Sequence, residues 1–405
     1  MWEQIRSNRV RSVVLVAVMG AVLLLLGWVL GLYFFPDSPA VGMVMALIVW
    51  AIMNLVAISQ GDSILLSVAG ARKIKRADHP RLYNIVEEMK IASGLEKMPD
   101  IYIIDDPALN AFATGRDVNH ASVAITAGLL QKLNRDELQG VIGHEMAHIR
   151  NRDVMLMAIS AVFLGTIVML SWYASRFVFY GGMAGSRRHS SRDNGGGGGQ
   201  VIVLVVAIVL MILAPIMAQF IHFAISRRRE YLADASSALY TRYPEGLASA
   251  LEKLSTSNAG VKSANQATAP MYIVNPFQKA GMSANSLSAT HPPIAERVRI
   301  LRTMGGASYA DYERAYKQMK GNGIVPGSAL AGSAVGLRAA APAAVEEPTE
   351  EIERARDTSN LLWGMNDYKT IDCECGTRLR VPPDFKESTL QCPHCGRIHQ
   401  LGAGD

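Results

Sequence analysis

Charged residues are scarce in this sequence of 405 residues. Asp, Glu, Lys and Arg make up 19% of it, whereas a typical soluble domain carries about 25%. Half of the residues are hydrophobic, and the mean hydropathy is positive, at +0.16. This balance excludes a disordered chain and disfavours a purely soluble enzyme. The length exceeds what one hydrophobic core usually organises, so more than one structural unit is expected.

A strong excess of one charge sign is also missing, because the net charge is only +5. In such an apolar chain a small positive balance is more typical of cytoplasmic loops than of a nucleic-acid-binding surface, which argues against nucleic acid as a partner. Cysteine is absent before Cys373, and all four cysteines lie between Cys373 and Cys395. This clustering predicts one metal site rather than a scattered disulfide framework.

Four long apolar runs predict membrane helices. Residues 13–35 and 41–58 form the first pair, and residues 154–173 and 201–225 form the second. The first run exceeds the roughly 20 residues that a helix needs to cross the hydrocarbon layer, and it is too long for the apolar core of a signal peptide. We therefore expect an α-helical membrane protein with about four transmembrane helices, arranged as two hairpins.

The positions of Lys and Arg predict the orientation. Basic residues lie before the first run, after the second, before the third and after the fourth, whereas residues 36–40 contain none. The positive-inside rule then places both termini and the two large connecting parts in the cytoplasm, in a multi-pass protein of the cell (inner) membrane. Four arginines between the third and fourth runs would face outward. The alternative is that these two runs dip into the bilayer without fully crossing it.

A His-Glu-x-x-His pattern predicts a metal-dependent hydrolase. Asn134 and Glu137 form a capping-box pattern, so a helix is expected to begin there. On that helix His144 and His148 lie one turn apart, and both imidazoles can reach one zinc ion. Glu145 can reach a water molecule at that ion. The alternative is a chance match on an ordinary amphipathic helix.

A third ligand is predicted further along the chain. Glu230 and Asp234 share one face of a helix, so Glu230 can bind metal while Asp234 accepts a hydrogen bond from a ligand histidine. The alternative is a pair of solvated carboxylates. The predicted topology favours the metal site, because His148 precedes the third apolar run and Glu230 follows the fourth. A membrane hairpin would return Glu230 to the side of His148.

The chain resembles the HtpX-like membrane zinc metallopeptidases, which are related more distantly to the CAAX prenyl endopeptidases. The resemblance covers roughly residues 1–301 and is carried by several motifs: Ala69-Gly-Ala-Arg72, Asn110-Ala-Phe-Ala-Thr-Gly115, the His-Glu-x-x-His helix with Asn151 and Asp153, Glu230 with Asp234, and Thr290-His-Pro-Pro293 followed by Arg297. It implies a membrane protease with a mostly helical, zincin-like α+β catalytic domain on the cytoplasmic face, which degrades damaged or misfolded membrane proteins. It makes His144, His148 and Glu230 the zinc ligands and Glu145 the general base.

The resemblance also suggests how a substrate binds and how the reaction is assisted. It implies that a short exposed strand provides a cleft edge to which a peptide adds as a further strand, at Asn110, Ala111, Phe112 and Ala113. An ordinary turn with a strand end is the alternative. The resemblance to the family also makes His291 and Arg297 candidates for stabilising a tetrahedral oxyanion. A lone histidine is more often a structural residue.

The C-terminal tail predicts a separate zinc ribbon. Two pairs of cysteines are each followed by glycine, which permits a tight turn around one ion: Cys373, Cys375, Cys392 and Cys395. Four thiolates make a closed, structural zinc site, with strands expected at 377–381 and 397–401. A cytoplasmic location disfavours disulfides, and iron is a chemical alternative to zinc. The ribbon would dock substrate, an adaptor or another chain. The alternative for this tail is nucleic acid, because the tail is basic at several positions: Lys369, Arg378, Arg380, Lys386 and Arg397.

Together these patterns divide the chain into six parts. They are an N-terminal transmembrane hairpin at 1–58, a first catalytic part at 59–153, a second hairpin at 154–226, a second catalytic part at 227–320, a flexible linker at 321–362 and a zinc ribbon at 363–405. The expected function is zinc-dependent endoproteolysis of membrane proteins. The alternatives are a non-catalytic scaffold that recruits partners through the ribbon and a prenyl-protein endopeptidase, which would need more spans.

Overall fold

The computed structural model describes residues 2–35, 37–163, 227–257, 260–264, 268–274, 291–330, 335–339, 348–385 and 389–401. The third predicted membrane run begins in this described part as the apolar helix Asp153–Phe163. Residues 164–173 and the fourth run at 201–225 lie outside it. The expectation of four transmembrane helices therefore stays a prediction.

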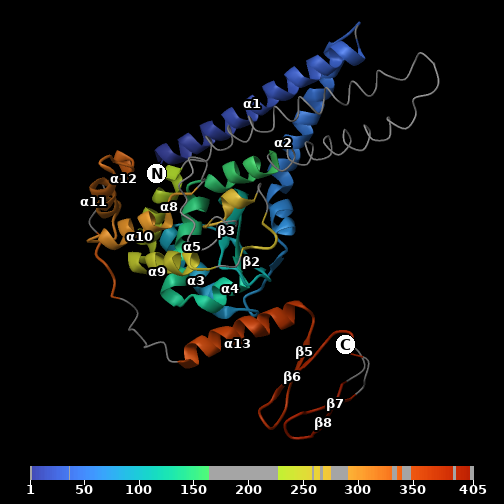
Figure 1. Cartoon of the computed structure of the whole chain (residues 1–405), viewed down its shortest axis with the longest axis vertical. Coiled ribbons are helices and arrows are strands. Elements are labelled where there is room, and N and C mark those ends of the chain that lie inside the picture. The colour runs from blue at the N-terminus through green and yellow to red at the C-terminus, as the bar shows by residue number, and fades with distance from the viewer. Residues whose placement is uncertain are drawn as a thin grey trace, which may run out of the picture.

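Two long helices project from the body of the molecule (Figure 1). They are α1 (Trp2–Phe34) and α2 (Ala40–Val68), and both contain stretches long and apolar enough to cross a membrane. Glycines allow them to pack closely, as in many membrane helix pairs. A Cβ atom on Gly42 would lie 2.1 Å from the carbonyl oxygen of Gly27, so any larger residue would force the helices apart.

A four-stranded sheet forms one wall of the body. Its strands are β1 (Ala71–Lys73), β2 (Asp100–Ile104), β3 (Ala111–Asp117) and β4 (His120–Thr126). Their order is β1-β2-β4-β3; β2 and β4 are parallel, and the other two pairs are antiparallel. The strand β3 is therefore an edge strand, and it contacts the helix that carries the His-Glu-x-x-His pattern.

Helices cover this sheet and form the rest of the body (Figure 1). They are α3 (Pro80–Ser93), α4 (Ala127–Lys132), α5 (Arg135–Arg150), α8 (Arg227–Thr241), α9 (Pro244–Ser255), α10 (Ile294–Thr303), α11 (Tyr309–Lys320) and α12 (Gly327–Leu330), with a 3-10 turn at Ala269–Met271. The α+β catalytic body expected from the sequence is thus present. It is one continuous hydrophobic core that draws on the sheet and most of these helices.

The central helix α5 is held at both its start and its middle. The capping box predicted from the sequence is confirmed: Glu137 N donates to Asn134 Oδ1 at 2.9 Å, and Asn134 N donates to Glu137 Oε2 at 2.9 Å. A Cβ atom on Gly140 would lie 2.6 Å from the backbone nitrogen of Leu247, so glycine is needed for the close approach of α9. Residues 137–149 of α5 are all buried.

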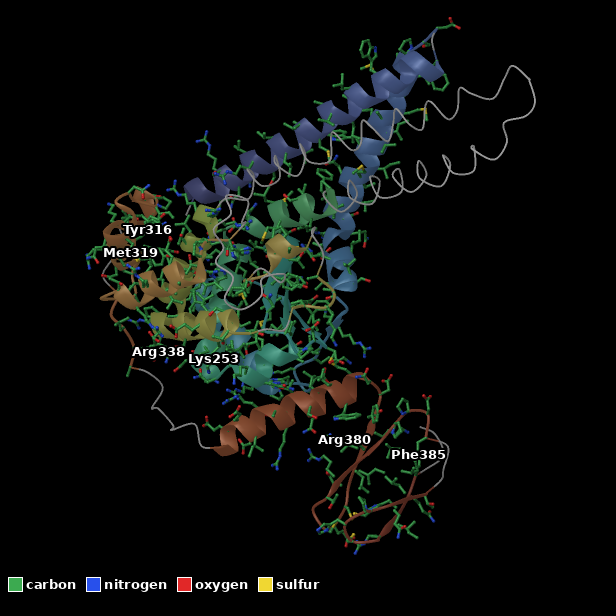
Figure 2. All side chains as sticks on the ribbon, in the orientation of Figure 1. Lys253, Tyr316, Met319, Arg338, Arg380 and Phe385 are labelled. Atoms are coloured by element: carbon green, nitrogen blue, oxygen red, sulfur yellow. The ribbon has the colours of Figure 1, made fainter. Side chains whose placement is uncertain are left out.

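Part of the segment predicted to be a flexible linker is helical and docked. Helix α13 (Pro348–Met365) falls largely within residues 321–362, and Leu361 is only 5% exposed within the main core. Arg338, labelled in Figure 2, also anchors this stretch, since its Nη2 donates to Asp136 Oδ1 at 2.6 Å. The stretch is rich in Ala, Pro and Glu, a composition typical of linkers, but it also contains a few apolar residues on one helix face. Those residues explain why α13 is a docked helix and not the flexible linker that we expected.

The tail folds as two β-hairpins, one beside each of the predicted cysteine pairs. Strand β5 (Lys369–Asp372) pairs with β6 (Arg378–Val381), and β7 (Thr389–Gln391) pairs with β8 (Ile398–Gln400). The strands predicted at 377–381 and 397–401 are thus confirmed as β6 and β8. Arg380, labelled in Figure 2, fixes the ribbon to α13 by donating to Asn360 Oδ1 at 2.8 Å and stacking 5.2 Å from the ring centroid of Trp363.

Candidate metal centre and active site

Three side chains predicted to bind metal meet in the interior. His144 and His148 project from α5, and Glu230 projects from α8. The Nε2 atoms of the two histidines are 3.2 Å apart, and Glu230 Oε2 and Oε1 lie 3.5 Å and 3.7 Å from Nε2 of His144 and His148, respectively. A tetrahedral zinc ion with ligands at about 2.1 Å separates its ligands by about 3.4 Å. The donor types and their spacing therefore fit zinc.

Glu145 is a buried carboxylate beside this cluster with few hydrogen-bond partners. It is 1% exposed, and neither of its oxygens makes a hydrogen bond of normal geometry within the described residues. Burial raises its pKa, while the neighbouring His144, His148 and the backbone N–H of Ala113 favour its charged form. A buried carboxylate with so few hydrogen bonds is costly, so this position is suited to a water molecule that approaches the metal site.

Asp234 supports His144 from behind, as expected. His144 Nδ1 is 3.0 Å from Asp234 Oδ1, an arrangement that leaves Nε2 free for metal. Burial opposes a charge on His144, but the carboxylates of Asp234 and Glu230 outweigh this effect and raise its pKa to about 9. The charge on Asp234 is in turn paired with Arg297, whose Nη2 and Nε donate to its two oxygens at 2.6 Å and 2.8 Å.

Asp153 contacts Nδ1 of His148, just as Asp234 contacts Nδ1 of His144. Its Oδ2 is 2.9 Å from His148 Nδ1, and its side chain is fully buried. The sequence places Asp153 in a recognisable motif but gives it no role. Its spacing from His148, five residues across the end of α5, is the only local signal, and the contact depends on the sharp turn at Asn151 and Arg152.

His291 and Arg297 both lie close to the metal cluster, but they differ in their surroundings. Burial lowers the pKa of His291 to about 4, and so its ring is neutral near pH 7. Arg297 is fully buried and directed at Asp234, and its Nη1 lies 4.0 Å from Glu230 Oε2. It also donates to the carbonyl oxygen of Ile273 at 3.3 Å.

The predicted substrate edge is strand β3, but it is buried rather than exposed. Asn110 directs its backbone toward β4, where its carbonyl accepts from Thr126 N at 3.1 Å. Alternation along an antiparallel strand then directs the backbone groups of Ala111 and Ala113 outward. The carbonyl of Ala111 already accepts from Ile273 N at 3.0 Å, and Ala113 faces Glu145. Tertiary packing of α2, α5 and the segment around Ile273 covers this edge.

Phe112 and Asn110 hold that covering segment in place. The ring of Phe112 meets Tyr272 edge to face, with centroids 5.1 Å apart. Asn110 Nδ2 donates to the carbonyl of Val274 at 3.0 Å. Three of the four residues predicted to contact substrate, Asn110, Ala111 and Phe112, thus contact residues 272–274 of the protein's own chain in this structure.

The four cysteines of the tail meet as predicted. Cys373 Sγ lies 3.5 Å from Cys395 Sγ, and Cys375 Sγ lies 3.7 Å from Cys392 Sγ, so they form no disulfide and match the spacing of a tetrahedral tetrathiolate site. Gly376 adopts a positive φ of 84° directly after the first pair, which a residue with a Cβ atom would tolerate poorly.

A family model described as Peptidase family M48 matches residues 76–305, more than half of the chain. The chain belongs to peptidase family M48. The Protease HtpX homolog of Dictyoglomus turgidum is 42% identical over 304 residues, which are 75% of this chain and 95% of that protein. The Protease HtpX homolog of Lactobacillus helveticus is also 42% identical over 304 residues, which span 100% of its length. A crystal structure of S. mikatae Ste24p aligns with a TM-score of 0.39 and 17% identity, covering 74% of this chain and 67% of that one.

Membership of peptidase family M48 confirms the resemblance to HtpX-like metallopeptidases. Together with the His144, His148 and Glu230 cluster and two helices of membrane-spanning length, it identifies a membrane metalloprotease, and the family implies zinc. Because 304 residues span the whole L. helveticus protein, the rest of this chain has no counterpart in that relative.

Proposed function

We propose that this M48 peptidase is a zinc endopeptidase that cleaves damaged or misfolded membrane proteins on the cytoplasmic side of the cell membrane. The observation that carries the proposal is the position of Glu145. Its buried carboxylate, whose oxygens have no hydrogen bond of normal geometry within the described residues, lies between a three-donor zinc site and the outward-facing backbone of Ala113 on an edge strand. A scaffold without activity has no use for such a costly arrangement, which disfavours that alternative.

The protein's side chains divide the chemical work. A bound zinc ion would supply a Lewis acid for the scissile carbonyl and for water. Glu145 accepts the proton of the attacking water and delivers it to the leaving amine, as a general base and then a general acid. His291, neutral near pH 7, is proposed to donate a hydrogen bond to the oxyanion. For Arg297 we revise the role expected from the sequence: its donors are directed at Asp234, so it positions His144 through that carboxylate.

Substrate recognition is proposed to use the backbone of β3. A peptide strand can pair with outward-facing groups such as those of Ala113, which would lay its scissile bond across Glu145. Backbone pairing tolerates many sequences, which suits a protease for unfolded segments. Since β3 is buried here, a substrate must first displace the covering chain, and the Ile273 to Ala111 contact is one bond that it would replace.

The membrane arrangement and the tail complete the proposal. We propose that the catalytic body and both termini lie in the cytoplasm, which the basic residues around the apolar runs support through the positive-inside rule. The division into two transmembrane hairpins, a split catalytic domain and a C-terminal ribbon also remains our proposal, with α13 now a docking helix instead of a linker. The ribbon would hold a second, structural zinc through Cys373, Cys375, Cys392 and Cys395 and recruit substrate or an adaptor.

The test uses the purified protein in membrane vesicles with a misfolded membrane protein whose cytoplasmic and outer loops carry different tags. The proposal expects cleavage of the cytoplasmic loop only, and none by Glu145→Gln. The control is Glu96→Gln, which changes an exposed carboxylate in the same way. Cleavage of the outer loop, or equal cleavage by Glu145→Gln, would refute the proposed function.

A further inference from the structure

The first membrane helix reaches into the polar network behind the zinc site. Asn8 lies near the start of α1 and is 1% exposed. Its Nδ2 donates a hydrogen bond to Asp153 Oδ1 and a second, of 3.1 Å, to the carbonyl oxygen of Asn151. These contacts join residues that are 145 and 143 positions apart in the sequence.

Asp153 uses its two oxygens for two different partners. Oδ1 accepts from Asn8, and Oδ2 lies 2.9 Å from His148 Nδ1. A carboxylate can only accept, so Nδ1 of His148 carries the hydrogen and Nε2 is the atom left for metal. Nε2 is indeed the atom that faces the other ligands, 3.2 Å from His144 Nε2. A continuous chain of hydrogen bonds therefore runs from Asn8 through Asp153 to His148.

The turn that presents Asp153 needs such a brace. Helix α5 ends at Arg150, and Arg152 adopts a φ of 58°, a left-handed conformation that is unfavourable for a residue with a side chain. Asn8 binds this turn on both sides of Arg152, at Asn151 and Asp153. The amide of Asn8 is neutral, so it fixes Asp153 without cancelling the negative charge that His148 requires.

From this geometry we infer that Asn8 is a positioning residue of the zinc site, through which membrane helix α1 orients His148. The inference rests on the proposed function of His148 as a zinc ligand. It makes α1 part of the catalytic unit rather than a simple anchor. The position of Asn8 agrees with this role, because Asn8 lies three residues inside the membrane-length stretch Ile5–Leu25, among Arg6, Arg9 and Arg11. It is therefore at the boundary between membrane and catalytic body.

The test measures metal binding by the full-length protein in detergent, in a Glu145→Gln background that prevents self-cleavage. Asn8→Leu keeps the branched shape and the number of heavy atoms of the side chain and removes its donor. The affinity of the catalytic site for zinc, measured by competition with a chelator, should fall on the order of 10-fold. The visible spectrum of cobalt bound at that site should change as well. The control, Ser12→Ala, removes a neighbouring buried hydroxyl that donates to Asn8 O at 3.0 Å, and it should leave both readouts unchanged.

A second comparison separates positioning from general damage. Asp153→Asn should weaken zinc binding more than Asn8→Leu, and the double variant should bind zinc no worse than Asp153→Asn alone, since Asn8 acts through Asp153. If Asn8→Leu does not fold, Asn8→Ser decides, and it too should bind zinc more weakly. Zinc affinity and a cobalt spectrum like those of the parent, or additive effects of the two substitutions, would overturn the inference. Because the readout is metal binding, failure here is distinct from failure of the proposed peptidase activity.

Discussion

Arg297 and Asp234 form a buried, two-pronged ion pair directly behind His144. Both side chains are fully buried, and the two nitrogen–oxygen distances are 2.6 Å and 2.8 Å. One carboxylate thus orients a zinc ligand while its charge is balanced from the other side. The pair explains how the interior of the protein tolerates an ionised Asp234, because an unpaired buried charge would be far more costly.

We expect Arg297→Met to destabilise the protein and to weaken zinc binding. Removing one partner of a buried pair typically costs about 3–5 kcal/mol of the free energy of unfolding. Thermal unfolding in detergent and zinc content would measure both effects. The matched double variant Asp234→Asn/Arg297→Met should recover part of the stability. If Arg297→Met kept full stability and zinc but lost activity alone, Arg297 would belong to oxyanion stabilisation, as the sequence first suggested.

The two metal sites should respond separately to substitution. His148→Ala and Glu230→Gln are each expected to lose the catalytic zinc, because three protein ligands are needed at an open site, while the closed tetrathiolate site stays intact. Metal analysis should fall from about two zinc ions per chain to about one. Conversely, Cys392→Ser should remove only the ribbon zinc. Loss of both ions from any one of these variants would contradict the separation.

The fall of peptidase activity at acid pH should reflect protonation of Glu145. The base must be ionised to accept a proton, and burial raises its pKa above the ordinary value of 4.5. Activity is therefore expected to be present at neutral pH and to be lost as the pH falls through a value higher than 4.5. A profile of kcat/KM against pH would measure this limb. A limb at or below 4.5, with the zinc still bound, would contradict a buried base.

Helix α13 should behave as a docked element. Leu361→Ala is expected to weaken its attachment to the body, by about 2–5 kcal/mol if the site behaves like other buried leucines. Limited proteolysis around residues 340–365 should then become faster. Ile352→Ala is the control, because Ile352 lies on the same helix and is 48% exposed. Equal protease resistance in both variants would favour the flexible tether expected from composition.

Local patterns in the sequence were sufficient to predict the residues at the centre of the metal site. The capping box at Asn134, the spacing of His144 and His148, and the return of Glu230 to their side all depend on short-range periodicity and a simple topology argument. The two cysteine pairs of the ribbon are likewise a local pattern, since two cysteines and a following glycine define each turn.

The remaining features depend on contacts between distant segments, which a single sequence does not reveal. The bond from Asn8 to Asp153 crosses 145 positions, and nothing near Asn8 marks it as different from other polar residues beside a membrane helix. The partner of Arg297 and the covering of β3 by Ile273 are long-range in the same way. Composition misled for α13, because only its few apolar residues, such as Leu361, determine where it packs.

The central claim is that His144, His148 and Glu230 hold a zinc ion at which Glu145 activates water. Its most direct measurement is hydrolysis of an unfolded protein such as casein by chelator-stripped enzyme, before and after zinc is restored, for the unmodified protein and for Glu145→Gln. The account predicts that zinc returns to both proteins with similar affinity, but that activity returns only to the unmodified one, at least about 100-fold above the variant. Activity in Glu145→Gln equal to that of the unmodified protein, or activity in the stripped enzyme without zinc, would contradict it.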